Sequence, residues 1–181
     1  MSFAKAFSGL STTDHRLMRR LNRWNAPRWI RWWMLASTRG GDGWFWAFCG
    51  IAVLASHDRD RLAAFFAAAI AAAAGILVFS IVKRCVGRPR PCALEPHCWA
   101  TLLPPDQFSF PSGHSITAFA VAIPLSLFYP VAAPVLLALA ASIALSRIVL
   151  GMHFLTDVIA GSIMGSVLGS IAFYAVTELR G

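Results

Sequence analysis

The sequence predicts an all-α integral-membrane protein: a helical bundle of about five transmembrane helices, with room for a sixth, behind an N-terminal amphipathic arm at the membrane interface. Hydrophobic residues make up 57% of the 181 residues and charged residues only 13%, against about 25% charged in soluble proteins. The apolar residues also gather in runs of helix length, separated by polar or proline-rich stretches. We therefore divide the chain into a basic, tryptophan-rich arm (1–38) and a transmembrane domain (39–181), whose extramembrane loop covers about 84–111.

The arm has the pattern of amphipathic helix over residues 11–38, with a break or kink at Pro27. Leu17, Leu21 and Trp24 share one face at helical spacing, and arginines occupy the other. Further tryptophans favour the lipid head-group layer, and the arginines attract anionic lipids. Net charge +8 would also suit nucleic-acid binding, but a nucleic-acid-binding protein would not need the apolar runs that follow. We predict a membrane partner and no nucleic acid.

Five apolar runs predict the spans. They cover residues 44–55, 62–82, 115–128, 135–150 and 154–176. The first is short for a hydrocarbon layer of about 30 Å, and the second is the strongest. In the last run, Gly161, Gly165 and Gly169 recur every four residues, which lines one helix face with glycine for close helix–helix contact.

Three clusters of basic, histidine and acidic residues stand at the ends of these runs. Lys83 to Pro91 follows the second run, Pro111-Ser112-Gly113-His114 opens the third, and Ser146-Arg147 with His153 and Asp157 joins the fourth to the fifth. Alternating spans place all three clusters at the same membrane face. The sequence therefore predicts that they form one site.

The first two clusters suit an oxyanion. Lys83 and Arg90 are fixed cations beside a rigid Arg-Pro-Arg-Pro turn, and arginine can fork onto two oxygens of a phosphate. Ser112 is a good helix N-cap, and Gly113 lets an anion approach the free N–H groups of a helix start. His114, when protonated, can donate to a leaving oxygen.

The third cluster suits a nitrogen nucleophile. Arg147 interrupts an apolar run, which by itself suggests a functional site. His153 and Asp157 are four residues apart and would share a helix face. The carboxylate could then hold one ring nitrogen and leave the other free to attack. The combination predicts a site that grips a phosphate and transfers it to histidine.

These spaced motifs, Lys83-x6-Arg90-Pro91, Pro111-Ser112-Gly113-His114 and Ser146-Arg147-x5-His153-x3-Asp157, resemble the three-part signature of the type-2 phosphatidic acid phosphatase superfamily, with every defining position filled. The resemblance implies that His153 forms a phosphohistidine, that Asp157 orients and stabilises it, and that His114 protonates the leaving oxygen. It implies that the remaining matched residues cradle the phosphoryl oxygens without a metal or other cofactor: Lys83, Arg90, Ser112, Gly113 and Arg147.

We therefore expect a lipid phosphate phosphatase, with undecaprenyl diphosphate, phosphatidylglycerol phosphate, phosphatidate and lipid A phosphate as open substrates. A phosphotransferase using the same phosphohistidine is one alternative. A non-catalytic lipid transporter or binding protein is another, although its cations would be spread over several depths. The superfamily's vanadium haloperoxidase branch fits poorly with so apolar a chain. The oligomeric state is left open.

The orientation of the site is also left open by the residues themselves. The arginine-rich arm favours the cytoplasm by the positive-inside rule, whereas the resemblance implies a multi-pass protein of the bacterial inner (cytoplasmic) membrane with its active site facing the periplasm. An arm on the periplasmic side, or an extra crossing between Trp24 and Ala55, would reconcile the two. A Cys92–Cys98 disulfide can form if the loop faces an oxidising compartment, and a zinc site with His97 fits no standard spacing.

Overall fold

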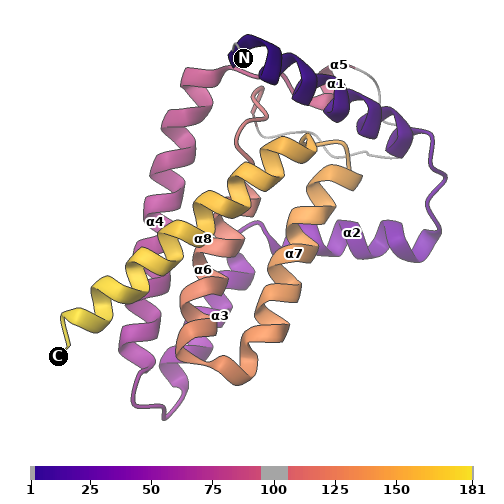
Figure 1. Ribbon diagram of the computed structural model, residues 1–181. Helices are drawn as coiled ribbons and strands as arrows, with labels where there is room; N and C mark the ends of the chain where they lie inside the picture. Colours follow the sequence, from indigo (N-terminus) through magenta and orange to yellow (C-terminus); the bar gives the residue numbers. More distant parts are fainter. Residues whose placement is uncertain (1–2, 95–105, 181) are drawn as a thin grey trace.

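The computed structural model describes residues 3–94 and 106–180, and within these ranges it forms helices and no strand (Figure 1). The only extended pairing in them is an isolated bridge between Pro89 and Phe108. The helices are α1 (Phe3–Asn22), α2 (Arg28–Gly40), α3 (Trp44–Ala55), α4 (Arg61–Val86), α5 (Pro91–Leu94), α6 (Gly113–Phe128), α7 (Ala133–Val149) and α8 (Leu155–Glu178), with a short 3-10 turn at Pro130–Ala132.

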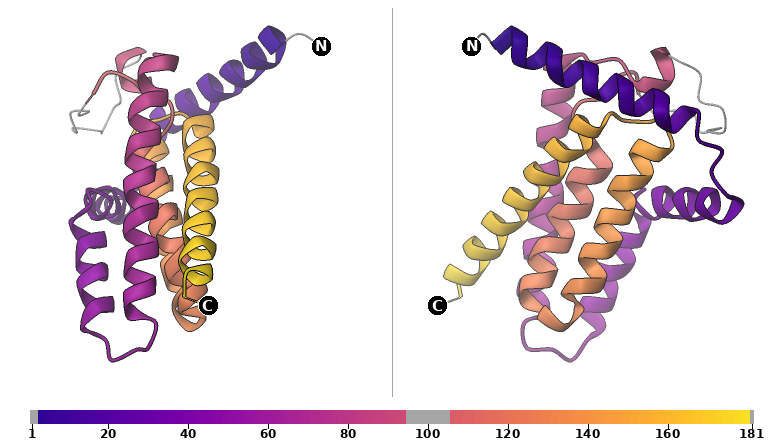
Figure 2. Two further views of the ribbon diagram at one scale, coloured as in Figure 1. Left: turned by 90° about the vertical axis from the view of Figure 1, so that its left-hand side faces the viewer. Right: turned by 45° about the vertical axis from the view of Figure 1, so that its right-hand side comes forward.

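The predicted apolar runs become the bundle, formed by α3, α4, α6, α7 and α8 (Figure 2). Among the described residues, three segments are long and apolar enough to cross a bilayer: Arg61–Val86, Pro130–Val149 and Leu155–Glu178. The two others, α3 and α6, are apolar but shorter. The all-α membrane bundle is therefore confirmed.

The arm forms two helices, because the chain leaves helical geometry after Asn22 and resumes after Pro27, which precedes the first turn of α2. Both run across the bundle rather than along it (Figure 2). On α2, Met34 and Thr38 are buried, whereas Trp29 and Trp32 are exposed. The additional crossing considered for residues 24–55 is therefore not found: α2 is a transverse helix, and α3 is the span already predicted.

The glycine face of α8 packs against α6, as predicted. Gly161, Gly165 and Gly169 are all buried. A Cβ atom added at Gly165 would lie 2.3 Å from the carbonyl oxygen of Ile116, so the two backbones approach as closely as glycine allows. The contact fixes the start of α6 and the start of α8, which carry two of the three clusters, relative to each other.

Candidate active site

The three clusters line one cavity of about 280 Å³ at the end of the bundle. Six of the eight predicted site residues reach its wall: Lys83, Arg90, Gly113, His114, Arg147 and His153. Ser112 and Asp157 lie behind the wall. The expectation that distant stretches of the chain meet at one place thus agrees with the geometry.

His153 lies on the turn between α7 and α8. Gly151 has a φ of +67°, a left-handed conformation that glycine adopts without strain, and it turns the chain after α7. The N–H groups of Met152 and His153 then both donate to the carbonyl of Arg147, at 3.0 Å each. The spacing between Arg147 and His153 is therefore the length of one hydrogen-bonded turn.

The His153 ring has one defined tautomer. Nδ1 lies 2.6 Å from the carbonyl oxygen of Ser109, and because a carbonyl only accepts, Nδ1 carries the proton. Nε2 is then unprotonated and accepts from Nη1 of Arg90 at 3.1 Å. Burial lowers the pKa of His153 to about 3, with Arg147 and Arg90 acting in the same direction against Asp157. The ring is neutral at physiological pH, as a nitrogen nucleophile must be.

Asp157 does not hold the ring in the way the sequence suggested. Its Oδ2 is 3.7 Å from Nδ1 of His153, too long for a hydrogen bond, because the Ser109 carbonyl occupies that direction. The carboxylate instead accepts from the backbone N–H of Phe154 at 2.8 Å and from Nη1 of Arg88 at 2.6 Å. Its contribution to His153 is therefore a nearby negative charge.

Lys83 and Arg90, two of the predicted phosphate ligands, both form ion pairs with Asp106. Asp106 accepts from Nζ of Lys83 at 2.6 Å and from Nη2 of Arg90 at 2.8 Å. Partial burial would raise the pKa of Asp106, but the hydrogen bonds from Lys83 and Arg90 outweigh it and the pKa is lowered. Asp106 is thus an ionised carboxylate in contact with both cations of the first motif.

Arg147 has no such partner in the part of the chain that the structure describes. The residue is only 4% exposed, and its Nη1 contacts the hydroxyl of Thr38. Within residues 3–94 and 106–180 it forms no ion pair, and its buried Nε has no hydrogen-bond partner. A buried guanidinium that makes no ion pair is costly, so Arg147 is suited to bind an anion at the cavity wall that it lines.

The second motif opens α6 as predicted. Ser112 is the N-cap, but its side chain makes no capping bond, and its N–H donates to the carbonyl of Asp157 at 3.1 Å. It is fully buried and does not line the cavity; its role as a phosphate ligand remains a prediction. Gly113 and His114 do line it.

His114 is held by a residue that the sequence did not single out. Its Nε2 lies 3.0 Å from Oδ1 of Asp42. A Cβ atom at the neighbouring Gly41 would lie 2.7 Å from the His114 ring, so the turn before α3 needs glycine to approach this closely. Asp42, like Asp106, Ser109 and Thr38, belongs to no motif; only Arg88, inside the Arg-Pro-Arg-Pro turn, carried a sequence signal.

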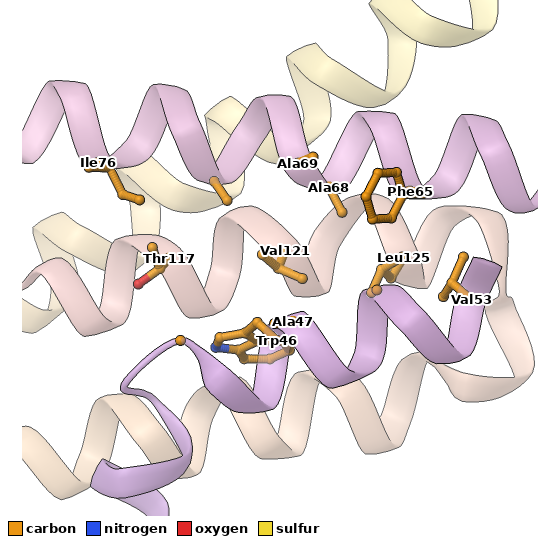
Figure 3. Close-up of a pocket in the computed structure, with 13 residues that line it drawn as sticks. Trp46, Ala47, Val53, Phe65, Ala68, Ala69, Ile76, Thr117, Val121 and Leu125 are labelled. Atoms are coloured by element: carbon orange, nitrogen blue, oxygen red, sulfur yellow. The ribbon is translucent and has the colours of Figure 1, made fainter. Parts of the chain in front are cut away.

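An apolar groove continues from the polar cavity. It lies between α3, α4 and α6, has a volume of about 280 Å³, and is lined by side chains such as Trp46, Phe65 and Val121 (Figure 3). Gly43, Ile76 and Thr117 line both spaces. The site thus joins a cationic pocket to a hydrocarbon-like wall.

Two predictions on the loop lie outside the described residues. They are the Cys92–Cys98 disulfide and the weaker zinc alternative with His97.

Two known phosphatases are similar to this chain in sequence. Decaprenylphosphoryl-5-phosphoribose phosphatase of Mycobacterium tuberculosis is 35% identical over 146 residues, 76% of this chain and 78% of that protein. Lipid A 1-phosphatase of Rhizobium johnstonii is 33% identical over 104 residues, 54% of this chain and 43% of that protein.

Two crystal structures share the fold. The transmembrane PAP2 type phosphatidylglycerolphosphate phosphatase of Bacillus subtilis matches with a TM-score of 0.73 and 22% identity, over 95% of this chain and 86% of that one. LpxE of Aquifex aeolicus matches with a TM-score of 0.66 and 23% identity, over 88% and 93%. A family profile described as PAP2 superfamily matches residues 62–180, a stretch that includes all three motifs. The chain therefore belongs to the PAP2 superfamily.

Proposed function

We propose that this protein is a membrane phosphatase that hydrolyses the phosphate of a lipid through a phosphohistidine on His153, without a metal ion. The observation that carries the proposal is the unprotonated Nε2 of His153 at a cavity wall that also contains the unpaired guanidinium of Arg147. Lys83 and Arg90 add two more cations to that wall. Fixed positive charge around a phosphoryl group is the main electrostatic contribution expected in such a reaction.

The chemistry then proceeds in two displacements. Nε2 of His153 attacks phosphorus, the bond from phosphorus to the lipid oxygen breaks, and His114 donates a proton to that oxygen. Water next attacks phosphorus and gives a proton to His114, the phosphorus–nitrogen bond breaks with its electron pair returning to Nε2, and phosphate leaves. The negative charge of Asp157 stabilises His153 while its ring is cationic.

The substrate's tail would lie in the apolar groove of Figure 3, because the groove shares three wall residues with the cavity. The named relatives act on a decaprenylphosphoryl phosphoribose and on a lipid A 1-phosphate. We therefore favour a phosphate monoester on a large lipid. Undecaprenyl diphosphate, phosphatidylglycerol phosphate and phosphatidate belong in the same substrate panel.

The test uses purified protein in detergent, with chelator present, and measures phosphate release across that panel. His153→Asn should abolish phosphate release, and no phosphorylated protein should be trapped during turnover. The variant should stay monodisperse, which shows that it still folds. Asp60→Asn is a matched control, because Asp60 forms an exposed ion pair with Arg180 at 2.7 Å, away from the cavity. Undiminished turnover in His153→Asn would exclude this residue as nucleophile.

The phosphotransferase alternative differs only in the acceptor that attacks the phosphohistidine. Adding a lipid alcohol to the same assay distinguishes them, because a transferase would yield a phosphorylated lipid instead of free phosphate. The non-catalytic transporter alternative is weakened by the gathering of Lys83, Arg90 and Arg147 around one cavity rather than along a path.

We also propose, on the basis of the family resemblance and against the positive-inside rule for the arm, that the site faces the periplasm of the inner membrane. The arm contacts the same end of the bundle as the site, through Asp14 and Arg88, so arm and site share a membrane face. A cysteine introduced near Asp106, in a protein whose native cysteines have been replaced, should react with an impermeant reagent in intact cells. Labelling only after lysis would place both on the cytoplasmic side.

A further inference from the structure

The N-terminal helix α1 contacts the turn that carries the proposed nucleophile. Met18 is buried, and together with Leu17 it borders a small internal space whose other walls include Gly151 and His153. Among residues 12–22 of α1, whose side chains the structure describes, none lines the catalytic cavity. The arm therefore supports the His153 turn from behind, in addition to lying across the end of the bundle.

Asp14 is the polar centre of this contact. It is only 2% exposed, which is unusual for a carboxylate on a surface helix. It accepts from Nη2 of Arg88 at 2.7 Å and from the backbone N–H of Thr156 at 3.2 Å, and it also contacts the Thr156 hydroxyl. Thr156 is in the first turn of α8, where a negative charge is favourable. Asp14 thus connects α1 to the turn after α4 and to the first turn of α8.

Arg88 connects Asp14 to the site. The same guanidinium that donates Nη2 to Asp14 donates Nη1 to Oδ1 of Asp157 at 2.6 Å and to Thr156 Oγ1 at 2.8 Å. Its carbon Cζ lies 4.0 Å from the centre of the Phe154 ring, a cation–π contact. Arg88 is therefore fixed on several sides, and it does not line the cavity, so it is not placed to bind phosphate.

We propose that Asp14 and Arg88 are positioning residues for the reaction, and that α1 is an integral part of the catalytic centre through them. The inference rests on the proposed phosphohistidine mechanism. Asp157 is not hydrogen-bonded to His153. The 3.7 Å between Oδ2 of Asp157 and Nδ1 of His153 therefore depends on the groups that hydrogen-bond the Asp157 carboxylate. Among the described residues these are the Phe154 N–H and Arg88, and the orientation of Arg88 depends in turn on Asp14.

This arrangement predicts a particular kinetic signature. The cations that bind the phosphate, including Lys83 and Arg147, do not contact Asp14 or Arg88, so binding should be spared. Stabilisation of cationic His153, which is needed only when the phosphorus–nitrogen bond forms, should be weakened. A loss confined to the chemical step lowers kcat and leaves KM unchanged.

The experiment compares Asp14→Asn, Arg88→Lys and the double variant of the full chain in detergent, where membrane attachment is not required. We expect each single change to lower kcat and the rate of phosphohistidine formation by about tenfold, with KM and inhibition by inorganic phosphate within about twofold of wild type. The double variant should be little worse than Arg88→Lys alone, because Asp14 acts through Arg88. Asp14→Glu, which keeps the charge, should recover part of the rate.

Two controls isolate the effect. Arg16→Gln removes an exposed charge from α1, and Asp60→Asn removes a carboxylate from an exposed ion pair; both should have wild-type kinetics. Wild-type kcat in Asp14→Asn would overturn the inference, as would a parallel loss of inorganic phosphate affinity and thermal stability, which would indicate only structural support. If Asp14→Asn does not fold, Arg88→Lys and Asp14→Glu decide the matter. A wild-type enzyme that never forms phosphohistidine would refute the proposed mechanism instead.

Discussion

The carboxylate of Asp106 should weaken the binding of the substrate's phosphate in the cavity. It contacts Lys83 and Arg90 at 2.6 and 2.8 Å, so an incoming phosphate must share these cations with it. We predict that Asp106→Asn tightens the binding of orthovanadate, an analogue of the phosphoryl group in transit. Asparagine keeps an oxygen for Arg90 and for the backbone N–H of Phe108, 3.1 Å away, but it releases Lys83 from its ion pair.

The size of the effect follows from the position of the carboxylate. Two unit charges about 4 Å apart interact by about 4 kcal/mol near a protein surface and by about 1 kcal/mol in water. The Asp106 side chain is 38% exposed, so solvent screening places the repulsion toward the lower figure. We expect about 1–2 kcal/mol, which corresponds to roughly 5- to 30-fold tighter inhibition.

The assay is inhibition of lipid phosphate hydrolysis by orthovanadate, with inorganic phosphate as a second ligand. Both inhibition constants should fall in Asp106→Asn and stay unchanged in Asp60→Asn, whose carboxylate is paired with Arg180 instead. Because product then leaves more slowly, kcat should not rise. Unchanged or weaker vanadate binding in a folded Asp106→Asn variant would show that the carboxylate does not compete with the anion, and the electrostatic reasoning would be wrong.

Three further predictions concern packing, charge and pH. Gly165→Ala should destabilise the protein by about 1–3 kcal/mol, because the new Cβ would lie 2.3 Å from the Ile116 carbonyl oxygen, whereas Gly40→Ala, with nothing within 4 Å, should not lower the apparent Tm. Arg147→Gln should weaken vanadate inhibition tenfold or more, by about 1.5–3 kcal/mol, without lowering Tm, since it removes a buried unpaired charge; a large loss of Tm would contradict this. The pKa of His153 falls from about 6.5 when unfolded to about 3 when folded, so the unfolded chain binds more protons between these values. Stability should therefore decline as pH falls through this window, and Tm measured against pH should fall less steeply in His153→Asn.

The sequence predicted the bundle well because hydropathy and helix length decide it. The apolar runs at 62–82 and 154–176 needed no tertiary information, and the four-residue spacing of glycine on α8 predicted a close contact that the structure has with α6. The convergence of the clusters followed from counting crossings. Membrane spans are constrained strongly enough that topology follows from order along the chain.

The partners of the site residues were not predictable in the same way. The Nδ1 of His153 is held by the backbone carbonyl of Ser109, and every residue has such a carbonyl, so no side-chain pattern announces it. Asp14 and Asp42 contact residues 74 and 72 positions away, and their neighbours in sequence carry no matching spacing. Ser112 is the opposite case, because the motif predicted it as a site residue. Its side chain is buried and does not line the cavity.

The close contact between α6 and the glycine face of α8 also limits how a lipid can reach the site. Backbone contact at Gly165 leaves no passage for a chain of methylene groups on that flank, whereas the groove beside α3 and α4 opens next to the cationic pocket. We expect substrate and dephosphorylated lipid both to pass through this groove. The dephosphorylated lipid would have to leave the groove before the next substrate could bind. The lipid product should therefore be a competitive inhibitor of the enzyme.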